Sequence, residues 1–369
     1  MFKWTFKSLF SQKATLFASS FGVASAFILV IFFSSVWQGE AEQIIAYPNK
    51  MEPDIWVMQK GVENLHMSMS FVWDWKAKLI EDMPEVKRVT PILYLNSVIV
   101  AKEKKLFGFV VGLLDKDDRA GPWELTQGRG IEGENEIVVP NVFRELASLE
   151  LGDTIQLADR SFNIVAFSKG TYSSANPVFF VRLIDLEKLL SSFGTFSYLL
   201  VDSNEGVDND RLVEKIKQKV SKVNALTHQA FVANDFALAK QMGVEIIFTM
   251  TLICSILAVL IIAYSSYALV SVQTGEIAIL KALGVRSPLV FMSVIIQSLF
   301  MTMLAFLVAS LFSLWVLPLI PELVPQITVR LTTSLLVSVG AIAFIVAALG
   351  AIFPAYKVLS IDPALVYKN

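Results

Sequence analysis

The fold class is decided by residues 246–275, IIFTMTLICSILAVLIIAYSSYALVSVQTG, because these 30 residues contain no Asp, Glu, Lys or Arg. A helix needs about 20 apolar residues to cross roughly 30 Å of hydrocarbon. Three more stretches lack these charges, at residues 14–39, 287–321 and 331–356. Buried helices of soluble proteins rarely run past about 14 residues without a charged one. The sequence therefore predicts four membrane spans, and Pro318, Pro321 and Pro325 predict that the third helix ends near Val316.

The charged residues are segregated along a chain that is 54% hydrophobic and only 17% charged. Residues 40–245 hold 23 Lys and Arg against 30 Asp and Glu, a net charge of −7. The segments before the first span, between the second and third, and after the fourth carry seven basic residues: Lys3, Lys7, Lys13, Lys281, Arg286, Lys357 and Lys368. Only Glu276 and Asp362 oppose them. The positive-inside rule then predicts a protein of the cytoplasmic (inner) membrane, with both termini cytoplasmic and the large acidic block outside.

The predicted fold is an α-helical membrane protein with four transmembrane helices and an α+β extracytoplasmic domain inserted between the first and second spans. The expected order is a cytoplasmic segment 1–13, a first span and stalk 14–39, the domain 40–243, a second span 244–272, a cytoplasmic helix 273–287, a third span 288–317, an external loop 318–330, a fourth span 331–356 and a cytoplasmic tail 357–369. A cleaved signal peptide is the alternative for the N-terminus, but its apolar run exceeds the usual 7–15 residues. We expect an uncleaved anchor.

Strand-like and helix-like patterns alternate through the external block. We expect strands at 54–58, 86–100, 106–113, 136–139, 154–158, 162–167, 178–181 and 197–201, and helices at 71–82, 142–149, 184–191, 209–221 and 233–243. The last helix is expected to continue into the second span as a stalk. The chain has a single cysteine, Cys254, which lies inside the second span, so no intramolecular disulfide can form.

The spans contain no ionisable path through the bilayer. Proton-driven carriers place Asp, Glu, Arg or His among their spans, whereas polar residues here are uncharged, such as Ser265, Ser266, Gln297, Ser298 and Thr302. Such residues more often bond one helix to another. A bundle of this kind is better suited to moving as a rigid body than to conducting ions.

Residues 273–288, QTGEIAILKALGVRSP, form the most informative short segment. Thr274 can cap a helix of about ten residues, Glu276 complements its N-terminal dipole, Gly284 suits a left-handed C-terminal end, and Pro288 opens the next helix. Ile277, Leu280, Leu283 and Gly284 share one face. From the residues alone, that apolar stripe could rest on lipid headgroups or fill a groove on a partner.

The segment Glu276-Ile277-x-x-Leu280-Lys281-Ala282-Leu283-Gly284 resembles the E-I-x-x-[LR]-[KR]-A-[LI]-G signature of FtsX/MacB-type permeases of ABC transporters. Three further stretches are similar to family patterns in the same order: residues 80–91, the pair 136–140 and 151–155, and Pro354-Ala355-Tyr356-Lys357 followed by residues 361–364. The resemblance covers the whole chain and includes its topology.

The resemblance implies a permease that dimerises with itself or a related chain and receives force from a cytoplasmic ATPase through a coupling helix. Its ATPase-facing residues would be Glu276, Ile277, Leu280, Lys281, Leu283 and Gly284. The sequence contains no G-x-x-x-x-G-K-[ST] motif, and only thirteen residues precede the first span. We therefore expect a non-catalytic chain without cofactors, with ATP and Mg bound by a separate subunit. Membrane lipids and a periplasmic adaptor are further expected partners, and nucleic acid is not.

The resemblance leaves the cargo open. Efflux of a lipid, drug or peptide and lipoprotein release are equally compatible, and the alternative is an FtsX-like transducer that activates an external partner such as a cell-wall hydrolase. No hydrolytic motif is found. The segment His66-Met67-Ser68-Met69 could bind a soft metal, although a flexible apolar loop is the simpler interpretation. Phe71, Trp73 and Trp75 are expected to be core or membrane-facing, with contact to a cargo or partner as the alternative.

Overall fold

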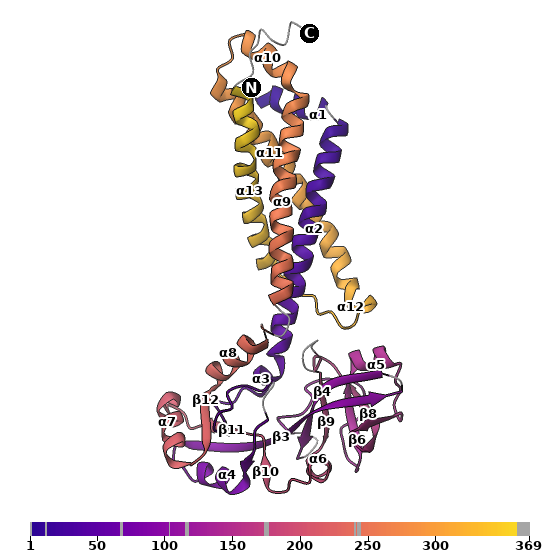
Figure 1. The fold of residues 1–369 in the computed structure, drawn as a ribbon, viewed down its shortest axis with the longest axis vertical. Helices are drawn as coiled ribbons and strands as arrows, with labels where there is room; N and C mark the ends of the chain where they lie inside the picture. The colour runs from indigo at the N-terminus through magenta and orange to yellow at the C-terminus, as the bar shows by residue number, and fades with distance from the viewer. Residues whose placement is uncertain are drawn as a thin grey trace. The chain divides into compact units, whose positions relative to one another are not determined.

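The computed structural model describes residues 2–11, 13–66, 69–102, 104–114, 118–172, 177–239, 241 and 245–359 (Figure 1). The chain divides into two compact units. A helical unit comprises Met1–Gly39, Glu245–Leu323 and Val329–Asn369, and an α/β unit comprises Glu40–Val244 and Val324–Thr328. The segment that separates the spans is thus a unit with its own core, and each unit is described by itself below.

The helical unit contains the four predicted spans. Among the described residues, four helical segments are long and apolar enough to cross a membrane: Lys13–Ile44, Glu245–Val272, Ser287–Leu323 and Thr333–Tyr356. They correspond to α2 (Lys13–Ile44), α9 (Glu245–Val272), α11 (Ser287–Val316) with the short η2 (Leu317–Leu319) and α12 (Ile320–Leu323), and α13 (Thr333–Leu359). A separate helix, α1 (Phe2–Ser11), precedes the first span. Helix α11 ends at Val316, as the following prolines predict.

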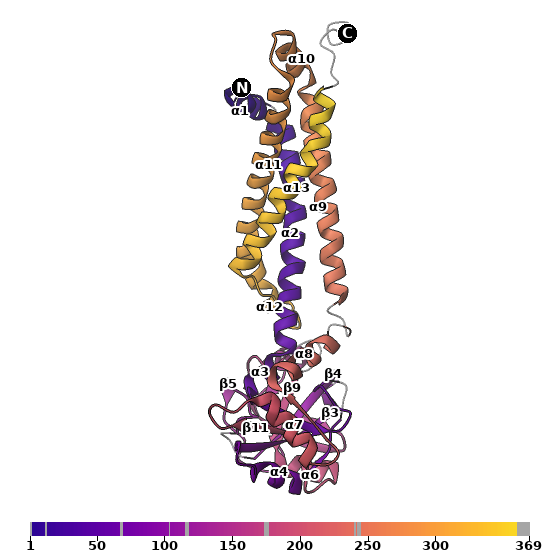
Figure 2. The ribbon, with the colours of Figure 1, turned by 90° about the vertical axis from the view of Figure 1, so that its left-hand side faces the viewer.

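Helices α9 and α11 both pack along α13 (Figure 2). Ala258, Ala305, Ala309, Ala343 and Ala347 are buried in one apolar cluster of the bundle. Ser266 of α9 and Ser298 of α11 are 2.7 Å apart and share a buried hydrogen bond. Since small side chains and hydroxyl pairs join helices where lipid offers no hydrophobic driving force, this bundle is held by packing and by polar contacts between helices.

The α/β unit is built on a ten-stranded mixed sheet with the order β12-β1-β11-β3-β4-β9-β6-β8-β5, and β7 pairs with both β3 and β8. Its strands are β1 (Ile55–Gln59), β3 (Val86–Ala101), β4 (Lys104–Leu113), β5 (Leu125–Gly128), β6 (Glu136–Pro140), β7 (Thr154–Leu157), β8 (Arg160–Ser168), β9 (Val178–Arg182), β11 (Tyr198–Ser203) and β12 (Val223–Thr227). A second, two-stranded sheet pairs β2 (Val72–Trp73) with β10 (Thr195–Phe196). The fold class is therefore that predicted: four spans, with an α+β domain inserted between the first and the second.

The long strand β3 joins two halves of the sheet. Its first half pairs with β11 and its second half with β4. Helices α4 (Asp74–Glu81) and α7 (Asn209–Lys219) belong to the half around β1 and β11, and α5 (Asn141–Ala147) and α6 (Leu183–Leu190) to the half around β4 and β9. The halves have separate apolar clusters on one face of the sheet, centred on residues such as Ile80 and Ile216 or Phe143 and Leu186.

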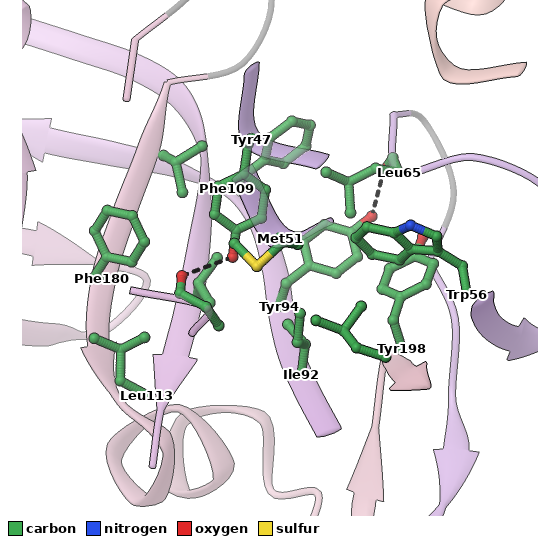
Figure 3. Packing of buried hydrophobic residues seen from close by; sticks show 14 of the residues in the cluster. Tyr47, Met51, Trp56, Leu65, Ile92, Tyr94, Phe109, Leu113, Phe180 and Tyr198 are labelled. Atoms are coloured by element: carbon green, nitrogen blue, oxygen red, sulfur yellow. Dashed lines mark hydrogen bonds between the residues drawn. The ribbon is translucent and has the colours of Figure 1, made fainter. Parts of the chain in front are cut away.

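An aromatic cluster fills the other face of the sheet (Figure 3). It also includes a residue of α8 (His228–Ala239), the last described helix before the second span. The ring of Phe231 on α8 stacks on Trp56 of β1, with centroids 4.2 Å apart and planes at 9°. Tyr94 donates a hydrogen bond from its hydroxyl to the Leu65 carbonyl oxygen at 2.8 Å, and burial raises the pKa of Tyr94 to about 12. Stacked rings add about 1 kcal/mol beyond the area that they bury, so the cluster ties α8 firmly to the sheet.

Several predicted elements are corrected. Residues 71–73 are not the start of a helix, because Val72 and Trp73 pair with β10, and α4 begins only at Asp74. Helix α8 begins at His228 rather than at residue 233. The predicted continuous stalk into the second span depends on residues 240 and 242–244, which lie outside the described residues. At the first span, helix α2 extends to Ile44, beyond the first apolar stretch.

Candidate functional site

The segment carrying the sequence signature is a short helix, α10 (Thr274–Ala282), between α9 and α11. Its N-cap is Gln273, and no side chain caps it. The predicted cap is wrong because the Thr274 hydroxyl donates instead to the carbonyl oxygens of Ser271 at 2.8 Å and Val270 at 3.3 Å. Thr274 thereby binds the start of α10 to the last turn of α9.

The C-terminal end of α10 has the predicted left-handed glycine. Gly284 has φ +87°, and its N–H donates to the Lys281 carbonyl oxygen at 3.0 Å. The Val285 N–H donates to the Leu280 carbonyl oxygen at 3.1 Å. These two bonds form a Schellman motif, which satisfies carbonyl groups that a helix end would leave open. Pro288 lies in the first turn of α11, so the hairpin has a fixed geometry at both ends.

The apolar residues of α10 do not form the single stripe that was predicted. Ile277 and Ala278 are fully buried, and Ile277 packs with Val270, Val290, Val294 and Ala355 of the neighbouring spans. Leu283, by contrast, is 76% exposed and Ile279 is 48% exposed. One side of the short helix therefore docks on the bundle, and the other side presents two large apolar side chains outward.

The remaining signature residues lie between these two sides. Leu280, Lys281 and Glu276 are half-buried, and Gly284 is exposed. Glu276 accepts a hydrogen bond through Oε2 from the Ser8 hydroxyl at 2.6 Å. The carboxylate thus connects α10 to the N-terminal helix α1, which is 268 residues away in sequence.

Helix α1 is itself packed on the bundle. The Gln297 side chain donates through Nε2 to the Thr5 carbonyl oxygen at 3.1 Å, and this bond is buried. Phe6 and Phe10 contact the ring of Phe300 edge-on, with centroids 5.2 and 6.1 Å away. Because α1 is held by α11, the hydrogen bond from Ser8 gives α10 a fixed lateral support.

Sequence reasoning missed three residues of this region: Ser8, Gln273 and Ile279. Gln273 is fully buried at the junction of α9 and α10, and its side-chain oxygen and nitrogen have no hydrogen-bond partner among the described residues. In the sequence, Gln273 was visible only as a polar residue that ends an apolar run just before a predicted helix. Ser8 gave no such signal, since its partner is known only from the fold.

The external candidates are changed by the structure. His66 Nδ1 lies 2.5 Å from Asp235 Oδ1, and both side chains are buried. Asp235 Oδ1 also accepts the N–H groups of Leu65 and His66, at 2.9 and 3.0 Å. His66 is thus engaged in joining a loop to α8, and Met67 and Ser68 of the candidate metal segment lie outside the described residues.

The aromatic residues Phe71, Trp73 and Trp75 are exposed, so of the two predicted placements, core or membrane-facing, the core is wrong. Phe193, also exposed, lies beside them, because the Asp74 N–H donates to the Gly194 carbonyl oxygen at 3.0 Å. These four residues are called the aromatic patch below.

Two family models match the chain. That of the MacB-like periplasmic core domain matches residues 14–219, and that of the FtsX-like permease C-terminal matches residues 248–363.

Curated relatives include an uncharacterized ABC transporter permease of Mycobacterium tuberculosis, 23% identical over 292 residues that cover 78% of each chain. Another, from Methanocaldococcus jannaschii, is 24% identical over 233 residues, 58% of this chain and 57% of the relative.

Among solved structures, the chain is similar to the periplasmic region of MacB from Actinobacillus actinomycetemcomitans, with a TM-score of 0.36 and 12% identity over 49% of this chain and 92% of that one. It is also similar to the extracellular domain of the ABC-type transporter YknZ from Gram-positive bacteria, with a TM-score of 0.33 and 10% identity over 42% and 90%. The first of the two family models covers more than half of the chain, and the matches show that the chain belongs to the MacB/FtsX-type permeases of ABC transporters.

Proposed function

We propose that the chain is a mechanotransmitting permease subunit. ATP hydrolysis by a separate cytoplasmic ATPase would drive export or extraction of an amphipathic or lipophilic substrate, such as a lipid, lipoprotein, drug or peptide, on the outer side of the membrane. The chain would work as a dimer with a second copy or a related permease. Residues 40–243 would form the external domain, and both termini would lie in the cytoplasm of a bacterial or archaeal cell.

The observation that carries this proposal is the two-sided character of α10. Ile277 packs against the ends of α9, α11 and α13, Ala278 beside it is buried, and Ile279 and Leu283 are left exposed. A helix docked on the bundle by one side and apolar on the other is suited to passing force from a partner to the spans. The exposed apolar pair would enter a groove on the ATPase, with Leu280, Lys281 and Glu276 at its margin.

The composition of the spans supports motion rather than conduction. All the Asp, Glu, Lys and Arg residues between positions 246 and 356 lie in residues 276–286 or 322–330, which adjoin the apolar stretches. The spans therefore offer no charged partners for an ion path.

The test is a comparison of two leucines with similar exposure. Leu283→Asp replaces a residue that is 76% exposed on α10, and the control Leu323→Asp replaces one that is 80% exposed on α12. Leu283→Asp should abolish co-purification with the ATPase and the permease-dependent part of ATP hydrolysis, because a charge in an apolar groove is desolvated without a partner. Leu323→Asp should retain both. Normal assembly and hydrolysis in Leu283→Asp would refute the coupling assignment.

A signalling role is the second candidate, and the aromatic patch is the observation that favours it. Trp73, Trp75 and Phe193 are 54%, 51% and 62% exposed on the α/β unit. Exposed aromatic groups are typical of protein interfaces. If replacing Trp73 and Trp75 by Ser abolished a cell-wall phenotype while exported lipids and drugs stayed unchanged, an FtsX-like transducer would replace the transport proposal.

A further inference from the structure

The helical unit contains a cavity of about 410 Å³ between α2, α9 and α13. The three helices can be followed in Figures 1 and 2. Its volume lies within the range of about 300–1,000 Å³ that small-molecule sites occupy. All of its lining residues belong to the helical unit, and none of them carries a charge. The site therefore suits a ligand whose inserted part is neutral.

The lining changes from polar to apolar along the helices. In α2 the polar lining residues lie toward the C-terminal end, whereas in α9, and from Thr332 into α13, they lie toward the N-terminal end. All three groups thus lie toward the same end of the bundle, the external end. They include the six hydroxyl residues Ser34, Thr251, Ser255, Thr332, Ser334 and Ser338.

The opposite end of the cavity is lined by hydrocarbon. The residues that line it there lie near the middle of each span and include Phe27, Val30, Ala258, Ile262, Ala343 and Val346. On α13 the lining runs from Ser334 to Val346, which is about 18 Å at 1.5 Å per residue. Half of a bilayer's hydrocarbon core is about 15 Å thick. The cavity therefore has the depth of one leaflet.

Three of the six hydroxyl groups donate to carbonyl oxygens of their own helices and are satisfied when the cavity holds only apolar atoms. Thr251 donates to the Ile247 carbonyl oxygen at 2.9 Å, Ser255 to that of Thr251 at 2.8 Å, and Ser338 to that of Leu335 at 2.8 Å. Because these donors are used within their own helices, a hydrocarbon chain can lie against them without the penalty of an unpaired donor.

The indole of Trp37 is different. Its Nε1 atom is buried and has no hydrogen-bond partner among the described residues. Trp37 lies at the polar end of the cavity, where its ring contacts Phe248 with centroids 6.4 Å apart. An indole N–H can only donate, and a buried donor without an acceptor is costly. Because the Nε1 atom is buried even while the cavity is empty, the indole must turn before its N–H can meet the ester or amide carbonyl of a membrane amphiphile.

We infer that this cavity binds one acyl chain of a lipid or lipid-modified molecule from the outer half of the bilayer, with the Trp37 indole turning so that its Nε1–H donates to a linkage carbonyl of the ligand. The inference rests on the proposed transport function and names the class of substrate and where its hydrocarbon part is held. The polar head stays outside the cavity, so the site recognises the chain and its linkage rather than a particular headgroup.

The test uses the full chain in nanodiscs that contain a phosphatidylethanolamine with a diazirine on one acyl chain. After irradiation, mass spectrometry should find the label concentrated on cavity residues of α9 and α13. Ala343→Phe places a ring inside the cavity and should reduce this labelling at least about tenfold. Ala341→Phe adds the same ring at an exposed position of the same helix and should leave labelling unchanged.

Two further variants keep the test decisive if Ala343→Phe does not fold. Val259→Trp narrows the cavity from a side chain that is 38% exposed, so it overpacks less. Trp37→Phe keeps an aromatic ring but removes the donor, and should lower labelling about fivefold, the effect of one neutral hydrogen bond. Labelling spread evenly over lipid-facing residues and unchanged in both variants would overturn the inference.

The experiment also separates the cavity from the function. If the cavity variants lose labelling but the complex still exports its substrate, acyl binding stands and its assignment to transport fails. If Leu283→Asp uncouples the ATPase while labelling is uniform, the transport proposal stands and the cavity inference fails. Formation of a disulfide between two copies through Val259→Cys, in a Cys254→Ser background, would show that a second copy's helix fills the cavity and would also overturn the inference.

Discussion

The contact between Ser8 and Glu276 gives the sharpest prediction about α10. The Ser8 hydroxyl is buried and lies 2.6 Å from Glu276 Oε2. Ser8→Ala removes this donor and leaves the half-buried carboxylate without it. Helix α10 has nine residues, and isolated helices shorter than about 12–15 residues are marginal in water. Its order therefore depends on contacts with its neighbours, of which this is the polar one that reaches α1.

The magnitude follows from the chemistry of the bond. A hydrogen bond to a charged group contributes about 1.5–3 kcal/mol, and partial exposure of Glu276 places this one at the lower end. A loss of about 1.4 kcal/mol is a tenfold change in an equilibrium constant. Local opening of α10 should therefore become about tenfold more frequent in Ser8→Ala.

Hydrogen exchange of the full chain in nanodiscs measures this opening through peptides that cover residues 274–283. The matched control is Ser11→Ala on the same helix, because the Ser11 hydroxyl donates only to the Ser8 carbonyl oxygen, at 2.7 Å. Exchange in α10 should accelerate in Ser8→Ala and stay at the wild-type rate in Ser11→Ala. Equal rates in the two variants would refute the view that α1 supports α10, and a matching loss of ATP hydrolysis in the complex would link that support to coupling.

Three other predictions concern single side chains. Gly284→Ala should destabilise the end of α10 by about 1 kcal/mol, since φ is +87°, whereas Gly275→Ala should stabilise the same helix by up to about 1 kcal/mol; exchange rates across the hairpin would show opposite changes. Asp235→Ala removes the acceptor of three buried bonds and should lower stability by about 3 kcal/mol or more, against little change for the exposed Asp210→Ala, as measured by thermal unfolding of the full chain. The Arg129 guanidinium lowers the pKa of Glu136 to about 2 from an ordinary 4.5. The contribution of the Glu136 carboxylate to stability is therefore complete above about pH 4.5 and is lost as the pH falls through about 2. Unfolding temperatures should fall less over this window in Glu136→Gln than in wild type.

The spans and the long strands could be predicted because their signals are local and repeated. A span must be apolar over its whole length, and β3 and β4 keep strand-forming residues over 16 and 10 positions. Short strands carry too little of this signal. All four residues of β5 are exposed. Strand β2 has two residues, and its partner β10 is distant in the sequence. The helix predicted to begin at Phe71 begins instead at Asp74, because Val72 and Trp73 pair with β10.

The candidate site was predictable only where local rules suffice. The left-handed end at Gly284 follows from the residue's freedom at positive φ, and it is present. Burial of Ile277 depends on Val290 and Ala355, which are distant in sequence. A periodicity argument therefore could not distinguish the exposed Leu283 from the buried Ile277. Ser8 was invisible for the same reason.

Helix α9 has a different role at each end. Its first half lines the cavity through Thr251 and Ala258, so on that side it has empty volume rather than close packing. Its second half is bound to α11 by the Ser266–Ser298 hydrogen bond and leads directly into α10. This second half of α9 would pass on a displacement of α10 with little deformation, because packed interiors transmit strain rather than absorb it. The freedom to move is concentrated in the first half, where a change in the separation of α9 from α2 would alter the volume available to an acyl chain. Filling the cavity and disrupting α10 should therefore act on the same motion from opposite ends.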